Sequence, residues 1–420
     1  MINRQYLVTR LQQLRQSPDV WHGVVMTGSM LVAGVLDYLF SLLSGRWLAP
    51  AEYGILIAVQ AILQILLHAT NVIRNVVAYY VAEIWAETAT PSAVAPFLRR
   101  RYRWAWQYGL LATLLMALIS PLLARWLQFP TSAPLWAASL ALVMLFVRPV
   151  TDGTLQGLQQ FPQLSAVQVL QASLRLGFAI VLIRIGWGAF GAVVALPLAT
   201  TTAFFLAYYF LRPYWVLPTK AVRIPAISRR YSTHTLVGLL TFALMVNLDA
   251  IAVKRLFDPA VAGNYGPIVT LGKINLFVPL AIAMVLFPKA VERHTKGEDA
   301  RPILLASLAA AIVPGLGLSF LFFLFPDWIT LTLFGDEYTS LGVVMPLVGL
   351  ATTFFAGINV WLNYALSTAR PAYVYCLAAL LGGQVVALWW WHGTLEQVGL
   401  ILMVVALAGN VVAAGMLLRR

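Results

Sequence analysis

Long apolar segments recur along almost the whole chain, and they constrain the fold more than any other feature. A helix needs about 20 mostly apolar residues to cross the hydrocarbon core of a bilayer. Of the 420 residues, 61% are hydrophobic and only 10% are charged, whereas a soluble domain of this size carries about 25% charged residues. Too few charges are present to cover a water-facing exterior, so the sequence predicts a polytopic membrane protein.

The apolar segments predict about twelve transmembrane helices of at least 17 residues each. The first six lie near residues 20–44, 55–83, 104–127, 134–158, 163–186 and 189–211, and the second six near 232–256, 264–288, 303–325, 340–366, 371–391 and 396–417. We expect two lobes, 20–211 and 231–418, joined by a cytoplasmic linker at 212–230. Residues 1–19 precede them as a basic segment, either an interfacial helix or a disordered tail, and 419–420 form a short tail.

The positions of lysine and arginine predict the orientation of these helices. With a cytoplasmic N-terminus, nineteen Lys and Arg fall in segments expected inside and five in segments expected outside. Cytoplasmic loops of membrane proteins carry this excess of basic residues. We therefore expect both termini in the cytoplasm of a bacterial-type cell, with the protein in the inner (plasma) membrane.

The two halves of the chain contain the same residues at the same spacing. Asp37 is followed sixteen residues later by Tyr53, and Asp249 by Tyr265, at an offset of 212. Six crossings return the chain to its starting side, so the second copy has the same orientation as the first. The sequence thus predicts an all-α membrane protein of two six-helix lobes, related by a pseudo-two-fold axis along the membrane normal, with a site between them.

Seven charged residues lie more than five residues from either end of a predicted span. Charged side chains at helix centres cost about 2.5–3.5 kcal/mol each, so they usually face a cavity or a partner. The set comprises Arg74, Arg148, Arg175, Lys273, Asp37, Asp152 and Asp249. Its excess of cations favours an anionic ligand such as phosphate, which arginine binds in a bidentate manner.

Each charge also has a structural interpretation. Arg148 and Asp152 are four residues apart on one helix, where they can neutralise each other. Asp37 and Asp249 can pair with nearby basic residues such as Arg46 or Lys254, or they can bind a proton or sodium ion that drives transport, as can Asp152.

Three cations in the set differ from the others. Arg74, Arg175 and Lys273 have no acidic residue one helical turn away. For these three we favour a position facing the cavity over pairing across helices. His68 and His234 are interpreted as packing or boundary residues, and the single cysteine, Cys376, as buried filler.

Several ordered motifs resemble one family of membrane proteins. They are GRWLAPAEYG at 45–54, LQGLQQF at 155–161, SLRL at 173–176, NLD at 247–249, AGNY at 262–265, FP at 287–288 and LFGDEY at 333–338. Their order is similar to that in the polysaccharide and O-antigen flippases of the multidrug/oligosaccharidyl-lipid/polysaccharide exporter superfamily.

The resemblance implies a flippase that moves undecaprenyl-diphosphate-linked oligosaccharide from the inner to the outer leaflet by alternating access. Arg74, Arg175 and Lys273, with Arg148, would contact the diphosphate or acidic sugars. We choose these residues by their charge and their position within the spans, since the family's motifs do not identify the binding residues. The expected partners are this substrate, the bilayer and other polysaccharide assembly proteins, with no nucleic acid and no cofactor beyond a proton or sodium gradient.

Two rival functions remain open. An ion-coupled multidrug antiporter of the same superfamily would place acidic groups in the cavity to receive cationic drugs, whereas the excess here is basic. A membrane glycosyltransferase or polymerase needs carboxylates in sizeable loops, and the only clustered external carboxylates are Asp327, Asp336 and Glu337. No phosphate-binding Gly-Lys-Ser/Thr loop is present, which argues against direct use of ATP.

Overall fold

The computed structural model describes residues 18–215, 229–276, 299, 301–338, 342–368 and 370–418. These residues form helices and no strand, and ten helical stretches are long and apolar enough to cross a membrane. The predicted all-α membrane fold is confirmed. Our predictions for residues 1–17, for most of the linker and for the tail lie outside the described residues.

The N-terminal lobe contains the first six predicted spans. They are α2 (Pro18–Trp47), α3 (Pro50–Thr88), α4 (Pro91–Trp126), α5 (Ala133–Gly157), α6 (Phe161–Leu182) and α7 (Gly188–Phe210). Proline occupies the first turn of α3, α4, α5 and α6, where its missing N–H would have no partner in the helix anyway. Sequence thus marks where these helices begin.

The C-terminal lobe repeats this plan with one addition. Its described helices are α8 (Arg229–Leu256), α9 (Pro259–Gly272), α11 (Arg301–Leu324), α12 (Pro326–Phe334), α13 (Val344–Ser367), α14 (Ala372–Trp390) and α15 (Leu395–Leu417). The short helix α12 falls in a segment that we predicted to be a loop. The second half of the predicted span 264–288 lies outside the described residues.

Two helices are longer than the spans predicted for them by ten residues or more. Helix α3 has 39 residues and α4 has 36, about 58 Å and 54 Å at 1.5 Å per residue. The loop expected before residue 104 is mostly the first turns of α4, including Arg99, Arg100, Arg101 and Arg103. Apolarity marks the part of a helix inside the bilayer, but arginine is a good helix former, so the helix continues into water.

A tight turn joins α6 to α7 at the predicted break. Gly186 and Gly188 have φ values of +91° and +51°, a region that other residues rarely adopt. The two glycines let the chain reverse within η1 (Ile183–Trp187), so α6 and α7 pack side by side.

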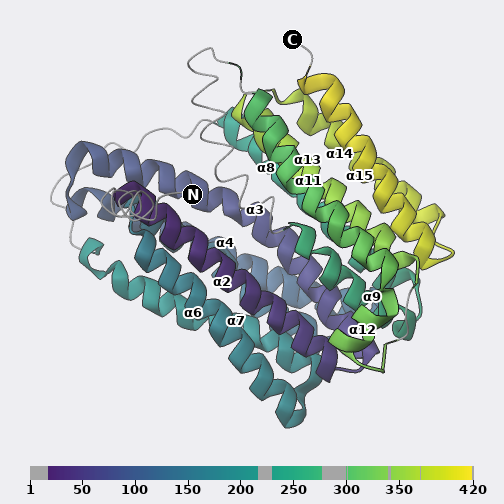
Figure 1. Ribbon diagram of the computed structural model, residues 1–420. Helices are drawn as coiled ribbons and strands as arrows, with labels where there is room; N and C mark the ends of the chain where they lie inside the picture. Colours follow the sequence, from purple (N-terminus) through teal and green to yellow (C-terminus); the bar gives the residue numbers. More distant parts are fainter. Residues whose placement is uncertain are drawn as a thin grey trace, which may run out of the picture.

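The two lobes meet at one end of the molecule and diverge toward the other (Figure 1). We call the end with the α2–α3 and α8–α9 connections the closed end, and the end with the α3–α4, α5–α6 and α13–α14 connections the open end. One hydrophobic core includes residues of both lobes, among them Tyr53 and Tyr265. A second core, near the open end, is formed by residues of the N-terminal lobe alone.

At the closed end, α3 and α9 approach each other closely. A Cβ on Gly54 would lie 3.1 Å from the Cα of Gly263, and a Cβ on Gly263 would overlap the carbonyl group of Pro50. Nearby, the hydroxyl groups of Tyr53 and Thr270 lie 2.6 Å apart. Only glycine permits this contact of one lobe's backbone with the other's.

A tyrosine on the connection after α12 adds to the closed end. The hydroxyl of Tyr338 donates to the carbonyl oxygens of Gly45 at 2.6 Å and Leu48 at 3.2 Å. Burial is the main cause that raises the pKa of the Tyr338 hydroxyl above its ordinary value, so this group stays protonated and can donate. Hydrogen bonds, as well as packing, therefore hold the two lobes together at the closed end.

Candidate functional site

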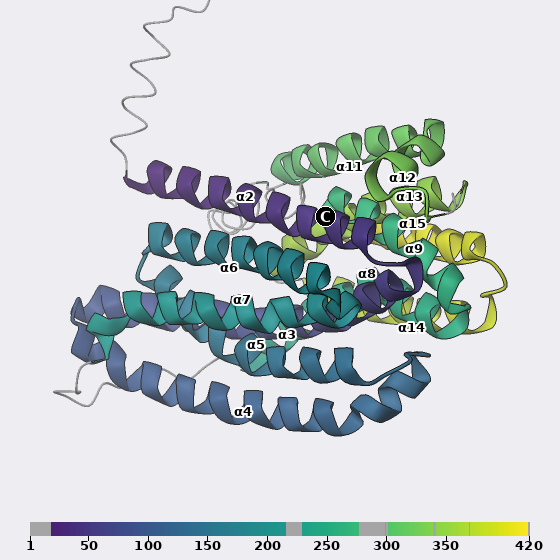
Figure 2. The same ribbon diagram turned by 90° about the horizontal axis from the view of Figure 1, so that it is seen from below.

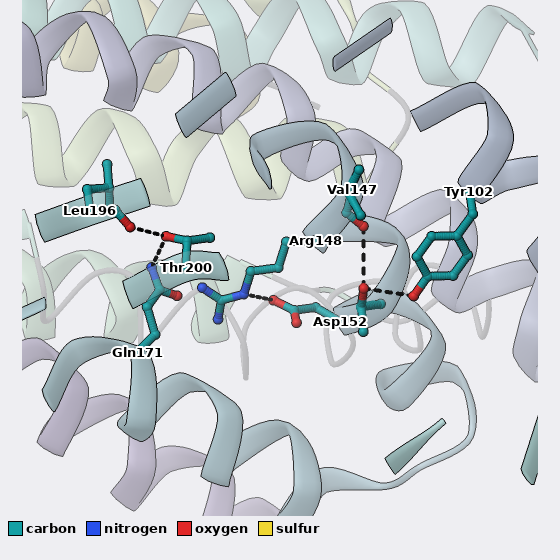
Figure 3. A network of polar contacts seen from close by, with 8 residues as sticks. Tyr102, Val147, Arg148, Asp152, Gln171, Leu196 and Thr200 are labelled. Carbon is teal, nitrogen blue, oxygen red and sulfur yellow. Dashed lines mark hydrogen bonds and ion pairs between the residues drawn. The ribbon is translucent and has the colours of Figure 1, made fainter. Parts of the chain in front are cut away.

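Three of the predicted site residues come together inside the N-terminal lobe. The Arg148 Nε and Asp152 Oδ2 atoms lie 3.4 Å apart, as Figure 3 shows, so the ion pair inferred from their spacing is present. Arg74, on α3, lies close enough to interact electrostatically with both side chains. We call Arg74, Arg148 and Asp152 the N-lobe cluster.

Small residues on α5 bring this cluster together. A Cβ on Gly153 would lie 2.5 Å from the carbonyl oxygen of Arg74, and one on Gly157 would lie 2.5 Å from that of Ala78. The absence of these side chains allows α5 to pack directly on the backbone of α3. Arg74 therefore lies beside the Arg148–Asp152 pair.

Neutral polar groups line the same region (Figure 3). The Tyr102 hydroxyl donates to Thr151 Oγ1 at 2.8 Å, and Gln171 Nε2 donates to Thr200 Oγ1 at 3.3 Å. These residues come from α4, α5, α6 and α7. Four helices of this lobe thus contribute neutral polar side chains near the cluster.

The N-lobe cluster carries two positive charges and one negative charge. Arg148 and Asp152 are each less than a tenth exposed. The buried Nε of Arg74 and Oδ1 of Asp152 have no hydrogen-bond partner, although buried polar atoms are usually paired. The surplus positive charge and the unused donor suit a phosphate or carboxylate ligand.

Asp37 and Arg175 form an ion pair across helices α2 and α6. Their Oδ1 and Nη1 atoms lie 3.0 Å apart, and the guanidinium of Arg175 lies over the ring of Phe40 at 4.0 Å. We had considered Arg46 or Lys254 as a possible partner of Asp37 and had favoured a cavity-facing Arg175 over one paired across helices; the structure shows that the two residues are each other's partners. Distance along the chain does not reveal a partner on another helix.

The C-terminal lobe holds the other two predicted residues. Lys273 Nζ donates to Asn247 Oδ1 at 3.0 Å, and the Tyr265 hydroxyl donates to Asp249 Oδ2 at 2.9 Å. Lys273 and Asp249 also interact electrostatically. Lys273 therefore has polar neighbours across helices, where we had favoured an unpaired cation; we call these four residues the C-lobe group.

The two sequence repeats diverge at this point. Tyr265 binds Asp249 within its own lobe, whereas the equivalent Tyr53 binds Thr270 of the opposite lobe. Asp37, the equivalent of Asp249, is paired with Arg175 instead. Matching residues in the two halves therefore have different partners, because each lobe contributes different neighbours.

Sequence reasoning missed one residue near the boundary between the lobes. His68 of α3 was interpreted as a packing or boundary residue, but it lies close enough to Lys273 to interact electrostatically. Its Nδ1 is 2.8 Å from the carbonyl oxygen of Gln64. No sequence signal identifies this proximity, because it depends on how the lobes dock.

The seven predicted residues thus form three sets and not one constellation. These are the N-lobe cluster, the Asp37–Arg175 pair and the C-lobe group with Asp249 and Lys273. Within the described part of the chain, no three His, Cys, Asp or Glu side chains are grouped as metal ligands would be.

The sequence matches the family described as polysaccharide biosynthesis protein over residues 42–342. The chain belongs to this family. The matched region covers more than half of the chain, and it includes all of the predicted site residues except Asp37. The family resemblance inferred from the motifs is therefore confirmed. No curated protein matches the sequence.

The fold is shared with solved transporters of low sequence identity. An inward-facing multidrug resistance MATE family transporter of the MOP superfamily is 12% identical, with a TM-score of 0.70, over 92% of this chain and 97% of the other. An outward-facing one is 15% identical, with a TM-score of 0.61, over 96% and 95%. A eukaryotic MATE transporter is 11% identical, with a TM-score of 0.67, over 95% of each.

This polysaccharide biosynthesis family member therefore has the fold of solved membrane transporters. Its architecture also agrees with the predicted division into two lobes. The shared fold carries no information on the transported molecule, because the identities are low.

The Arg148–Asp152 pair leads to a prediction about stability. Asp152→Asn keeps the side-chain shape but leaves the buried Arg148 and the half-buried Arg74 without a carboxylate; breaking a buried pair typically costs about 3–5 kcal/mol. We expect a clearly lower thermal midpoint for the purified protein. Asp299→Asn, in the more exposed pair with Arg301 at 3.9 Å, should change stability by less than about 1 kcal/mol. Equal midpoints for the two variants would show that the buried pair is not structural.

Proposed function

We propose that this transporter is a flippase for undecaprenyl-diphosphate-linked oligosaccharide in the synthesis of cell-surface polysaccharide. The observation that carries the proposal is the N-lobe cluster, which pairs two buried or half-buried guanidinium groups with only one carboxylate. Membership of the polysaccharide biosynthesis family supports the same substrate class.

The chemistry of the substrate fits this surplus of cations. A diphosphate is costly to move through hydrocarbon, because an ion loses its hydration there. Arg74, Arg148, Arg175 and Lys273 would replace part of that hydration with charge-assisted hydrogen bonds. The polyprenyl tail can stay in lipid, so lowering the barrier for the head is sufficient and no covalent step is needed.

Two arrangements of the lobes would give access to the two leaflets in turn. The structure has one end closed, where Tyr53 meets Thr270 and Tyr338 meets Gly45. Movement to the opposite state would break these bonds and bring the open ends together. Such rocking of one parallel repeat against the other about a central site is a known mode of alternating access.

We assign the open end to the cytoplasm. Arg99, Arg100, Arg101, Arg103 and Arg212 lie at or near that end, and basic residues are enriched in cytoplasmic segments. In this orientation both termini are cytoplasmic. The open end of the protein in the inner membrane would then face the cytoplasm. A substrate made on the cytoplasmic leaflet could then enter.

A multidrug antiporter is the second candidate, and the MATE-like fold favours it. In that function Asp37, Asp152 or Asp249 would bind a proton or sodium ion and compete with a cationic drug. The same carboxylates could couple oligosaccharide transport to an ion gradient. The pairing of each with a neighbouring cation or tyrosine in the structure leaves less negative charge for a drug.

Transbilayer movement in proteoliposomes separates the two candidates. The probes are a diphosphate-linked oligosaccharide lipid and a cationic dye, each compared with empty vesicles and with imposed proton and sodium gradients. Protein-dependent movement of the lipid without dye transport is the expected result. Gradient-driven dye transport without lipid movement would overturn the flippase proposal.

A further inference from the structure

We propose that the exposed face of α4 binds an anionic phospholipid of the surrounding bilayer. Arg100 and Arg103 would hold its phosphate headgroup, and the leucines that follow on the same face would contact its acyl chains. This binding site is separate from the transport function and does not depend on it.

The face changes in chemistry along its length. The exposed side chains at helical spacing run in the order Arg100, Arg103, Trp104, Gln107, Leu111, Leu114, Leu118, Leu122 and Arg125. Positions three and four apart lie on one side of a helix. Guanidinium groups therefore come first, an indole and an amide next, and then a strip of leucine.

The length of this face matches one bilayer. The rise from Arg103 to Arg125 is about 33 Å at 1.5 Å per residue, close to the hydrocarbon thickness of about 30 Å. Trp104 and Trp126 lie at the two ends of that distance, where aromatic residues usually meet the headgroups. Arg100 and Arg103 are thus placed at the phosphate level of one leaflet.

The position of α4 indicates a lipid of the bilayer and not the transported molecule. Helix α4 lies on the rim of the N-terminal lobe (Figure 2), packed mainly against α5, with α3 and η2 (Arg212–Tyr214) near its start. Substrate passing between the lobes would meet α3, α8 and α9 instead. The face is therefore open to surrounding lipid.

The charges on this face select an anionic headgroup. Within the described part of the chain, no carboxylate forms an ion pair with Arg100 or Arg103. The Arg100 guanidinium lies over the ring of Trp104 at 5.6 Å, which orients it along the helix. Two neighbouring guanidinium groups can bind phosphate oxygens in a bidentate manner, whereas a zwitterionic headgroup adds a cation that they repel.

Other residues strengthen the electrostatic attraction. Arg99 is exposed beside this pair, and Arg101 lies over the ring of Phe97 at 5.0 Å. Clusters of four or more basic residues next to a transmembrane helix are typical of sites for anionic lipids, and each residue near the surface contributes about a fivefold increase in affinity.

Titration of the purified, full-length protein with lipid, followed by native mass spectrometry, tests the proposal. The probes are phosphatidylglycerol and phosphatidylcholine. The variant Arg100→Gln/Arg103→Gln removes the proposed contacts, and Arg46→Gln/Arg184→Gln removes two exposed charges near the closed end that lie outside α4. We expect phosphatidylglycerol affinity to fall by about 10- to 30-fold in the first variant and little in the second, with phosphatidylcholine unaffected.

The wild-type protein provides a measurement that needs no variant. Binding of phosphatidylglycerol should weaken as salt is raised, because the headgroup contact is electrostatic and exposed. Equal affinity for the two lipids, salt-independent binding, or full binding by Arg100→Gln/Arg103→Gln would overturn the proposal. If a diphosphate-linked lipid at equal concentration displaced phosphatidylglycerol from this face, the face would be a binding site for the transported substrate and the proposal would be wrong.

Discussion

Arg74→Gln is expected to reduce flipping of a diphosphate-linked oligosaccharide lipid by about 10- to 100-fold, with the protein still folded and inserted. The guanidinium of Arg74 interacts with the Arg148–Asp152 pair, and its buried Nε lacks a hydrogen-bond partner. Hydrogen bonds to charged groups contribute about 1.5–3 kcal/mol each, which corresponds to this loss of rate. Glutamine keeps the helix and a polar end but removes the charge.

Two further substitutions distinguish a role in binding from a role in folding. Arg74→Lys keeps the charge but loses the bidentate geometry, so it should retain part of the activity. Arg212→Gln removes an exposed arginine from the short turn η2 and should transport normally. The measurement is lipid movement in proteoliposomes, normalised to inserted protein.

Lys273→Ala should also lose transport, because its amino group is the cation of the C-lobe group. Normal flipping by both Arg74→Gln and Lys273→Ala would remove these residues from the substrate path. The family assignment and the fold would stand.

Gly263→Ala is expected to open the closed end and to reduce transport by at least about tenfold. The added methyl group would overlap the carbonyl of Pro50 and approach the nitrogen of Ala51. Both are backbone atoms, which cannot move aside as a side chain can. Overpacking of this kind typically costs about 1–3 kcal/mol, enough to shift a two-state equilibrium by one to two orders of magnitude toward the other state.

Spin-label distances report this change directly. Labels at Glu87→Cys on α3 and Ala372→Cys on α14, in a Cys376→Ser background, lie near the open end of each lobe. We expect this distance to shorten in Gly263→Ala as the lobes rock. Gly317→Ala, where no atom lies within 4 Å of an added Cβ, serves as the control. An unchanged distance with normal transport would show that the contact at Gly263 does not hold the closed state.

Several parts of the fold could be predicted because they depend on local chemistry. Apolar length placed the helices, proline marked the starts of α3 to α6, and the glycines at 186 and 188 lie at the predicted break between α6 and α7. The repeat of Asp37 and Tyr53 by Asp249 and Tyr265 indicated two lobes. The ends of α3 and α4 were less predictable, since helices continue into water where apolarity ends.

The candidate site was predictable in its members but not in its pairings. The Arg148–Asp152 pair could be inferred, because both residues lie on one helix four residues apart. The partner of Asp37 is Arg175, on another helix, and the neighbours of Lys273 include Asn247 and His68. Contacts between distant segments depend on helix packing that no local pattern encodes.

The sequence by itself determined that the chain is a membrane protein of two repeated six-helix lobes, and it identified the family. These properties follow from apolar length, charge and motif order, which are read along the chain. Only the tertiary structure decided that the predicted charges form three separate sets, and that the lobes meet through Gly54 and Gly263 at one end. The reason is geometric, because the partners in each contact lie on different helices and meet only after those helices have packed.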